Sequence, residues 1–292
     1  MGSADAFEEH RTLLFTIAYE ITGTATDAED VVQDSYLKWA QVRDDDVQNP
    51  RAYLASVVTR TALNSLRSAQ RRREDYVGPW LPEPILTGPD VAEDAVLGEA
   101  LSMAMLVVLE SLTPDERAVF VLREVFDFPY TDIADATGKS TAAVRQLAHR
   151  AKEHVRDRQP RFDVDAAQQR QVANRFISAT LGGDLQSLMD LLAPGAVLIS
   201  DGGGKVSAAR RPVQGAERVA RFLLGLQSKP LPDMRVESCS LNNMPGLLIF
   251  SGPRLDVAAM IHVDGGKVTG VYLVRNPDKL ENLAAGARPG RQ

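Results

Sequence analysis

The spacing of apolar residues changes once along the chain, near residue 165, and this change limits the folds that the chain can adopt. Before it, apolar residues recur every three or four positions, as at Val32, Tyr36 and Trp39, which is typical of helices packed along one face. After it, short apolar runs such as 255–262 alternate with period two between Gly and Asn clusters. We therefore predict a multidomain chain, all-α at first and then α+β with a curved mixed sheet.

The same patterns predict the individual elements. Helices are expected over residues 5–20, 27–39, 52–68, 91–111, 117–126, 131–137 and 140–155. In the last part, helices are expected over 166–181 and 185–192, and strands over 196–200, 235–241, 247–250, 255–262 and 267–274.

Residues 76–90 interrupt the helical pattern with closely spaced Pro and Gly residues, so they predict an extended linker. The linker contains Trp80 and Leu81, and an exposed linker seldom carries two large apolar side chains together. We therefore expect it to dock on another part of the chain. The alternative is a plain spacer in which the tryptophan has no such role.

Acidic and basic residues are segregated along a chain whose formal net charge is −6. Residues 5–46 contain eleven acidic and three basic residues, whereas residues 51–73 contain six arginines and no acid. This alternation suggests one protein partner and one polyanionic partner. Cys239 is the single cysteine and no apolar run reaches 18 residues, so the sequence predicts a soluble, cytoplasmic protein without an internal disulfide.

A tight turn at Gly138 joins two of the predicted helices. This glycine can take the positive φ that ends the first helix, and Ser140 or Thr141 can cap the second. A second helix of this kind fits the major groove of DNA, with Arg145 and Gln146 near base edges and later basic residues on phosphates. The alternative is an ordinary helical hairpin with a solvated basic face.

Two further helices carry one-sided polar surfaces. The helix expected at 27–39 groups two carboxylates and an amide on one face: Asp30, Gln33 and Asp34. Such a face can dock a basic protein surface. The segment 51–73 places Arg60 and Arg67 on a shared face, which suits DNA whose strands are separating. Either face could instead be an ordinary solvated helix surface.

These segments, in this order, resemble the extracytoplasmic-function sigma factors of bacterial RNA polymerase. Residues 27–40 resemble region 2.2 of that family, residues 49–67 (NPRAYL through NSLR) resemble regions 2.3 and 2.4, and residues 112–151 (LTPDERAVF through HRA) resemble region 4. The resemblance implies two all-α sigma domains, the second a helix-turn-helix. It also implies an initiation factor that binds core polymerase at the β′ clamp helices and the β flap and reads −10 and −35 promoter elements.

The polymerase contacts implied are Asp30, Gln33 and Asp34. The DNA contacts implied are Arg60, Asn64, Arg67, Arg71, Ser140, Thr141, Arg145, Gln146, His149, Arg150 and Lys152. The sequence departs from the family where Leu147 and Ala148 replace a frequent Arg-Leu pair, and where Asn64 replaces a frequent Asp. The first departure changes residues of the helix that the resemblance assigns to the −35 element.

Three short motifs resemble the marks of one subgroup, which fuses a SnoaL-like cone of sheet and helices to the sigma core. They are Trp80-Leu81-Pro82-Glu83-Pro84, Asp201-Gly202-Gly203-Gly204-Lys205 and Asn276-Pro277-Asp278-Lys279-Leu280. The resemblance implies that the extension regulates the sigma core in cis and that no dedicated anti-sigma factor is needed. Regulatory contacts are expected at Trp80, Leu81, Pro82, Asp201, Gly202, Gly203, Gly204, Lys205, Asn276, Pro277, Asp278, Lys279 and Leu280.

The rival interpretation makes the last domain a cavity enzyme or a small-molecule sensor. Catalysis would need an acid such as Asp256, or His262, inside an apolar cavity, whereas a filled cavity favours a scaffold. The glycine run lacks the pattern of a phosphate-binding loop, because Lys205 is followed by Val206. We expect no metal, since the four histidines lie far from other ligand types, and no cofactor.

The domain boundaries follow from these patterns. We expect a region 2 domain over 1–77, a linker over 78–96, a region 4 domain over 97–160, a SnoaL-like regulatory domain over 163–286 and a flexible tail over 287–292.

Overall fold

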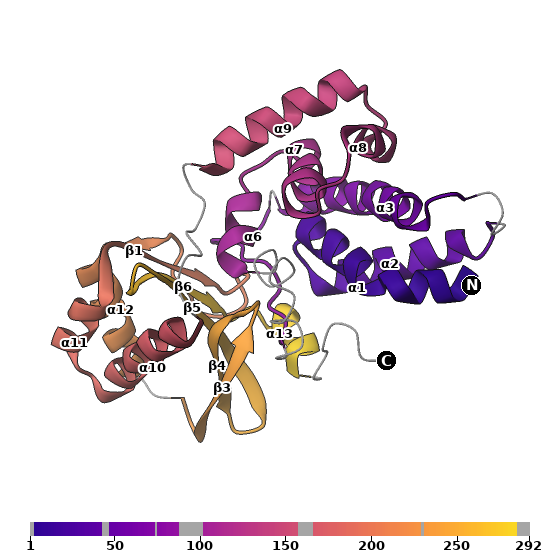
Figure 1. The fold of residues 1–292 in the computed structure, drawn as a ribbon. Coiled ribbons are helices and arrows are strands. Elements are labelled where there is room, and N and C mark those ends of the chain that lie inside the picture. The colour runs from indigo at the N-terminus through magenta and orange to yellow at the C-terminus, as the bar shows by residue number, and fades with distance from the viewer. Residues whose placement is uncertain are drawn as a thin grey trace.

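The computed structural model describes residues 3–42, 47–73, 75–87, 102–156, 166–228 and 231–284. Figure 1 shows two groups of helices on one side, a sheet with its own helices on the other, and helix α6 between them. This arrangement agrees with the predicted fold class, two all-α units followed by an α+β unit. Residues 91–101 of the helix expected over 91–111, and the tail expected over 287–292, lie outside the described residues. No helix in the described ranges is long and apolar enough to cross a membrane.

The N-terminal helical unit consists of α1 (Ser3–Thr22), α2 (Ala25–Trp39) and α3 (Pro50–Arg73), which pack against one another. Helix α2 is capped by Thr24, whose hydroxyl accepts a hydrogen bond of 3.3 Å from the backbone N–H of Asp27. This cap satisfies a helix N–H that has no partner within the helix.

Helix α2 faces the core with residues three or four positions apart. Its buried side is formed by Ala28, Val31, Val32, Ser35 and Trp39. The prediction that Tyr36 faces inward is wrong, because this side chain is 40% exposed. The inward stripe passes through Ser35, so Tyr36 lies at its edge, where its ring packs edge-on against Phe7 at 5.0 Å.

The second helical unit follows after the linker. Its elements are α6 (Met103–Leu109), α7 (Pro114–Phe120), a π-helical turn (Val121–Val125), α8 (Tyr130–Thr137) and α9 (Thr141–Arg156). Thr113 and Glu116 form a reciprocal capping box at the start of α7. One apolar cluster runs through both helical units and includes Leu54, Phe120 and Val144, so the two units share a core.

The C-terminal domain combines a sheet with four helices among the described residues. Its elements are α10 (Ala166–Gly182), α11 (Leu185–Leu191), β1 (Leu192–Asp201), β2 (Val213–Gln214), α12 (Ala216–Gln227), β3 (Met234–Leu241), β4 (Met244–Ser251), β5 (Arg254–Asp264), β6 (Lys267–Val274) and α13 (Pro277–Ala284). The strand order is β2-β1-β6-β5-β4-β3. Strands β1 and β6 pair in parallel and the other neighbours pair antiparallel, so the sheet is mixed.

Both faces of this sheet are apolar, and the alternation in β5 shows why. Ala259 and Ile261 join the cluster that lies under α10, α11 and α12. Ala258 and Met260 point to the opposite face, as the period of two requires. That face carries a second apolar cluster, here called the back-face cluster, whose other members include Leu81, Met103, Ala104, Leu280 and Leu283. The back of the sheet is therefore covered by the linker, α6 and α13.

Three elements of the C-terminal domain were not anticipated: β2, α12 and α13. No helix is predicted after the strand over 267–274, whereas the structure has one there. Pro277 occupies the first turn of α13, where its fixed φ is favourable and its missing N–H has no consequence.

Candidate polymerase and nucleic-acid interface

The acidic face of α2 points to solvent. Asp30, Gln33 and Asp34 are all exposed, on the side opposite the buried stripe that anchors the helix. A helix that is buried on one side and acidic on the other presents a rigid surface to a basic partner.

Helix α3 presents its predicted DNA-contacting side chains next to the second helical unit. Arg60, Asn64 and Arg67 are exposed residues. The side chain of Arg71 lies outside the described residues. Arg60 donates a hydrogen bond to the backbone carbonyl of Asp135, and Arg67 forms an ion pair of 2.9 Å with Asp115. Two of the predicted contacts are thus engaged within the chain.

The helix-turn-helix is built by α8 and α9. Helix α8 ends at Gly138, which has a φ of 68°. The hydroxyl of Ser140 caps α9 by accepting a hydrogen bond of 3.2 Å from the N–H of Ala143. Leu147 and Ala148 are both buried, so neither can contact DNA from this position. Their apolar character, the departure from the family pattern, serves the core of the unit.

The exposed side of α9 carries the predicted DNA contacts. Its exposed residues include Arg145, Gln146, His149, Arg150 and Lys152, and Thr141 is half-buried. Acidic neighbours already pair with some of these cations: Arg150 lies 3.4 Å from Glu116, and Lys152 lies 2.6 Å from Glu124. A phosphate that binds this side must displace the carboxylates.

An extended segment, residues 76–87, runs between the helical units and the C-terminal domain, and we call it the strap. Asp201, at the end of β1, is fully buried, and its carboxylate accepts two hydrogen bonds from the strap and one from α13. The Tyr76 hydroxyl donates to it at 2.5 Å, the backbone N–H of Leu81 at 2.9 Å and the ammonium of Lys279 at 2.7 Å. Burial, together with the hydrogen bond to Asp201, raises the pKa of Tyr76, so its hydroxyl stays protonated and can donate.

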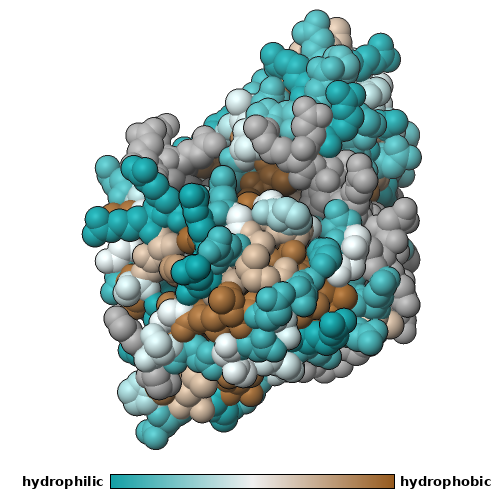
Figure 2. Space-filling model, turned by 90° about the vertical axis from the view of Figure 1, so that its left-hand side faces the viewer, coloured by the Kyte–Doolittle hydropathy of each residue, from teal (hydrophilic) through white to brown (hydrophobic). Residues whose placement is uncertain are grey.

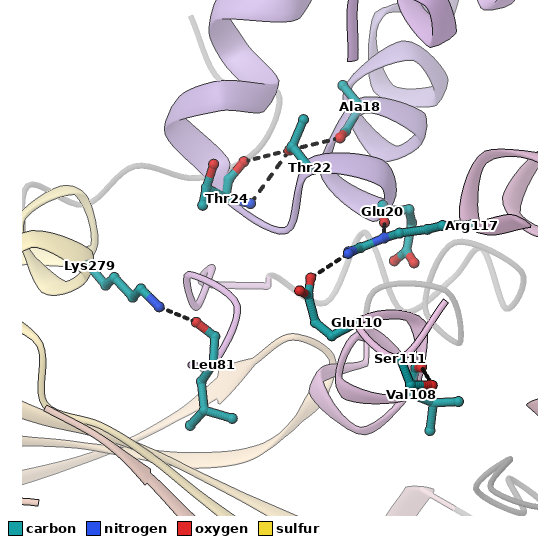
Figure 3. Close-up of polar contacts among 10 residues, drawn as sticks. All are labelled: Ala18, Glu20, Thr22, Thr24, Leu81, Val108, Glu110, Ser111, Arg117 and Lys279. Carbon is teal, nitrogen blue, oxygen red and sulfur yellow. Dashed lines mark hydrogen bonds and ion pairs between the residues drawn. The ribbon is translucent and has the colours of Figure 1, made fainter. Parts of the chain in front are cut away.

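Lys279 completes this buried group from helix α13. Its ammonium also donates to the backbone carbonyl of Leu81, as Figure 3 shows, and lies 3.9 Å from the centre of the Trp80 ring. The structure thus brings the three sequence motifs together, since the strap, the end of β1 and the start of α13 meet at one buried ion pair. Leu81 is fully buried in the back-face cluster.

The glycine run after Asp201 forms a close turn against α13. Gly203 has a φ of 59°, and a Cβ atom added there would lie 2.4 Å from Nδ2 of Asn276. Only glycine fits this position without displacing Asn276. Beside it, Lys205 forms an ion pair of 2.6 Å with Asp278. The run therefore serves a contact between two segments of the domain.

Glu83 joins the strap to the start of α2. Its buried carboxylate accepts a hydrogen bond of 2.9 Å from the backbone N–H of Ala25, in the first turn of α2. It also accepts one of 2.9 Å from Asn282 of α13. A carboxylate at a helix N-terminus is favoured by the helix dipole. Helix α2 and the C-terminal domain therefore share one side chain as a partner.

The turn between β3 and β4 reaches the N-terminal unit. Asn242 is fully buried, donates from Nδ2 to the Tyr19 hydroxyl at 2.7 Å and accepts from the backbone N–H of Ile85 at 3.1 Å. The Tyr19 hydroxyl in turn donates to the Glu83 carbonyl at 2.6 Å. Sequence reasoning missed Tyr19, Tyr76 and Asn242. The Asn242-Asn243 pair signals a turn, but nothing in it signals burial.

A buried charged group lies where the two helical units meet the strap. Arg117 donates from Nε to the backbone carbonyl of Glu20 at 2.6 Å and pairs with Glu110, as Figure 3 shows. The Glu20 side chain is fully buried, and among the described residues neither of its carboxylate oxygens accepts a hydrogen bond. Burial raises the pKa of Glu20 well above its usual value, against the opposing effect of Arg117.

Asp256 and His262, the two groups considered for chemistry in the C-terminal domain, lie in different surroundings. The space between the sheet and α10 to α12 is filled by an apolar cluster. Asp256 lies instead beside a surface cavity of about 260 Å³, where it pairs with Arg254 at 2.6 Å. His262 is buried and shares a hydrogen bond of 2.8 Å with Thr269, and burial lowers its pKa. This packing favours a scaffold. On the side of the molecule formed by the C-terminal domain, polar and apolar patches are interspersed (Figure 2).

Comparisons with known proteins match the whole arrangement. Two family models match the chain, "Sigma-70 region 2" over residues 6–72 and "Sigma-70, region 4" over residues 102–155. The chain is 39% identical to the ECF RNA polymerase sigma factor SigJ of Mycobacterium tuberculosis, over 94% of this chain and 92% of that protein. It is 31% identical to the probable ECF RNA polymerase sigma factor SigI of the same species, over 96% and 95%. The crystal structure of the M. tuberculosis factor SigJ superposes with a TM-score of 0.75 at 34% identity, covering 95% of this chain and 98% of that one.

Proposed function

Because the chain belongs to the extracytoplasmic-function sigma factors of RNA polymerase, it binds core polymerase and directs promoter-specific initiation, and we propose that its SnoaL-like domain regulates this activity in cis. The proposed domains are region 2 over 1–77, the linker over 78–96, region 4 over 97–160 and the regulatory domain over 163–286. Sigma factors are not enzymes, and the filled interior of the C-terminal domain supports a regulatory scaffold here.

We assign the polymerase contact of region 2 to the acidic face of α2. Asp30, Gln33 and Asp34 are exposed together on a helix whose other side is fixed in the core, which suits the basic surface of the β′ clamp helices. Region 4 contacts the β flap in this proposal.

Promoter reading is divided between two helices. Helix α3 engages the −10 strand through the arginine face that includes Arg60 and Arg67, with Asn64 between them. Helix α9 enters the major groove of the −35 element, where Arg145 and Gln146 approach base edges and Arg150 and Lys152 contact phosphates.

The observation that carries the regulatory proposal is the double attachment of the strap. Its Leu81 backbone is held by Asp201 and Lys279 of the C-terminal domain, while its Glu83 carboxylate binds the start of α2. A change in the C-terminal domain therefore reaches the polymerase-binding helix through a few buried contacts. Such direct coupling needs no dedicated anti-sigma factor.

Run-off transcription tests the function. Core polymerase with the full chain should start at specific genomic promoters, and core polymerase alone should not. Arg145→Ala should relax the choice among −35 sequences, costing about 1–3 kcal/mol at one base pair. Arg150→Ala is the matched control and should weaken all sequences alike. Equal losses on every sequence for both variants would reduce Arg145 to a phosphate contact.

A further inference from the structure

Helix α3 packs against α7 and α8 of region 4, beside the face that we assign to DNA. Arg60 donates to the backbone carbonyl of Asp135 at α8, and Arg67 pairs with Asp115 at the start of α7. Two arginines on one face of α3 therefore already have partners in the other helical unit.

Asp115 holds cations from both units at once. Its Oδ1 pairs with Arg67 of α3 at 2.9 Å, and its Oδ2 pairs with Lys139, in the turn before α9, at 2.8 Å. Partial burial opposes the ionisation of this carboxylate, but Lys139 and Arg67 outweigh burial and lower its pKa. A DNA phosphate is also an anion that can bind an arginine and a lysine at once, so Asp115 occupies the place that a phosphate could take.

The two promoter-reading helices differ in this respect. On α9, the base-facing candidates Arg145 and Gln146 are exposed, and Arg145 lies over the ring of Tyr130 within its own unit, 5.5 Å from its centre. On α3, Arg60 and Arg67 reach across to region 4. The base-facing side chains of α9 are thus exposed to a duplex, while the arginines of α3 are engaged with region 4.

We propose that Asp115 is an intramolecular substitute for a DNA phosphate that keeps α3 engaged with region 4 in the free chain. The free chain then meets duplex DNA through α9 first. Helix α3 contacts a separated strand only after Asp115 releases Arg67. This inference rests on the proposed role of α3 in DNA binding.

The size of the effect follows from the strength of one exposed ion pair. Removing such a pair shifts an equilibrium by about two- to fivefold. While the closed form predominates, the apparent affinity of α3 for a strand rises by the same factor as the open fraction. The expected gain for Asp115→Asn is therefore about two- to fivefold.

The test compares Asp115→Asn and Asp115→Arg with Asp132→Asn and Asp132→Arg. Asp132 lies on α8 of the same unit, and its carboxylate accepts a hydrogen bond from the neighbouring Thr131, so it controls for the change in charge. Each variant is made in the full chain with Cys239→Ser, Gln41→Cys and Glu153→Cys. The two new cysteines place one dye just after α2 in region 2 and one on α9, both at exposed positions. Energy transfer reports closure, and a labelled single strand of mixed sequence, about 20 nucleotides long, reports affinity.

Energy transfer should fall from the parent to Asp115→Asn and further to Asp115→Arg, and strand affinity should rise in the same order. The Asp132 variants should match the parent. Unchanged energy transfer in both Asp115 variants, or equal gains in the Asp132 variants, overturns the proposal. Lower energy transfer without tighter strand binding would show that Asp115 closes the chain but that α3 does not bind the strand. The proposed DNA role of α3 would then fail, while the role of Asp115 in closure would stand. Run-off transcription with holoenzyme checks that each variant folds. If Asp115→Arg does not fold, Asp115→Asn alone is enough for the test.

Discussion

At the scale of single residues, Glu20 is the group whose environment is least favourable to its charge. It lies fully buried where both helical units meet, and its nearest cation, Arg117, directs Nε to the Glu20 backbone and another nitrogen to Glu110. A desolvated carboxylate in this position lowers the stability of the folded chain at neutral pH.

Glu20→Gln should therefore stabilise the protein by about 1 kcal/mol or more at neutral pH. Because the pKa of Glu20 is raised in the folded state, the stability that it contributes is complete below its ordinary pKa and is lost as pH rises through the raised value. Denaturant unfolding at about pH 5.5 and about pH 8 should show a pH-dependent loss in the parent that the variant lacks. Glu9→Gln, on the exposed side of α1, is the control. A variant less stable than the parent at both values would show that the carboxylate is needed.

At the scale of elements, α2 combines an anchored first turn with an exposed acidic face. Thr24 and Glu83 bind the N–H groups of its first turn, and the exposed face one turn later carries the proposed polymerase contacts. The helix is thus held by the chain on one side and available to the polymerase on the other.

Reversing the charge at Asp30 and Asp34 together, to lysine, should weaken binding to core polymerase by about tenfold or more, because charges that face a basic partner would then repel it. Folding should be unaffected, since both side chains are exposed. Fluorescence anisotropy with purified core polymerase measures the loss. Glu8→Lys with Glu9→Lys, on the exposed side of α1, is the matched control. An affinity equal to that of the parent would place the contact elsewhere.

The elements also show how far a sequence can be interpreted. The strand over 267–274 and the turn at Gly138 were predicted because local spacing and one glycine determine them. Helix α12 was missed although Val219, Ala220 and Leu223 mark its buried face, and α13 was missed because its proline suggested a bend. The exposed residues of the candidate surfaces follow from helix periodicity. The burial of Asp201 and Lys279 does not, because partners 78 positions apart meet only in the folded chain.

At the scale of the whole molecule, the strap ties three units into one body. It contacts α2 through Glu83, the C-terminal domain through Asp201 and Asn242, and it covers the back of the sheet beside α6 with Leu81. No unit can move far without breaking buried contacts of another.

Trp80→Ala combined with Leu81→Ala should loosen this body. Removing a fully buried leucine side chain costs about 2–5 kcal/mol in packing, and the tryptophan change removes the ring beneath Lys279. Solution scattering should give a larger radius of gyration, and run-off transcription should change. Val77→Ala, at an exposed position of the same strap, should alter neither. If the double variant scatters and transcribes like the parent, the strap is only a spacer.

The apolar back of the sheet also sets an order of events during synthesis. Leu81 and the start of α6 leave the ribosome long before β5, β6 and α13, which cover them in the finished protein. About 180 residues separate Ala104 from the end of α13, and translation at roughly 5–20 residues per second makes this interval about 10 to 40 seconds. During that time a nascent sigma core exposes the surface that its last domain will bury. Synthesis of β5, β6 and α13 is thus the step after which this surface of the newly made factor can be buried.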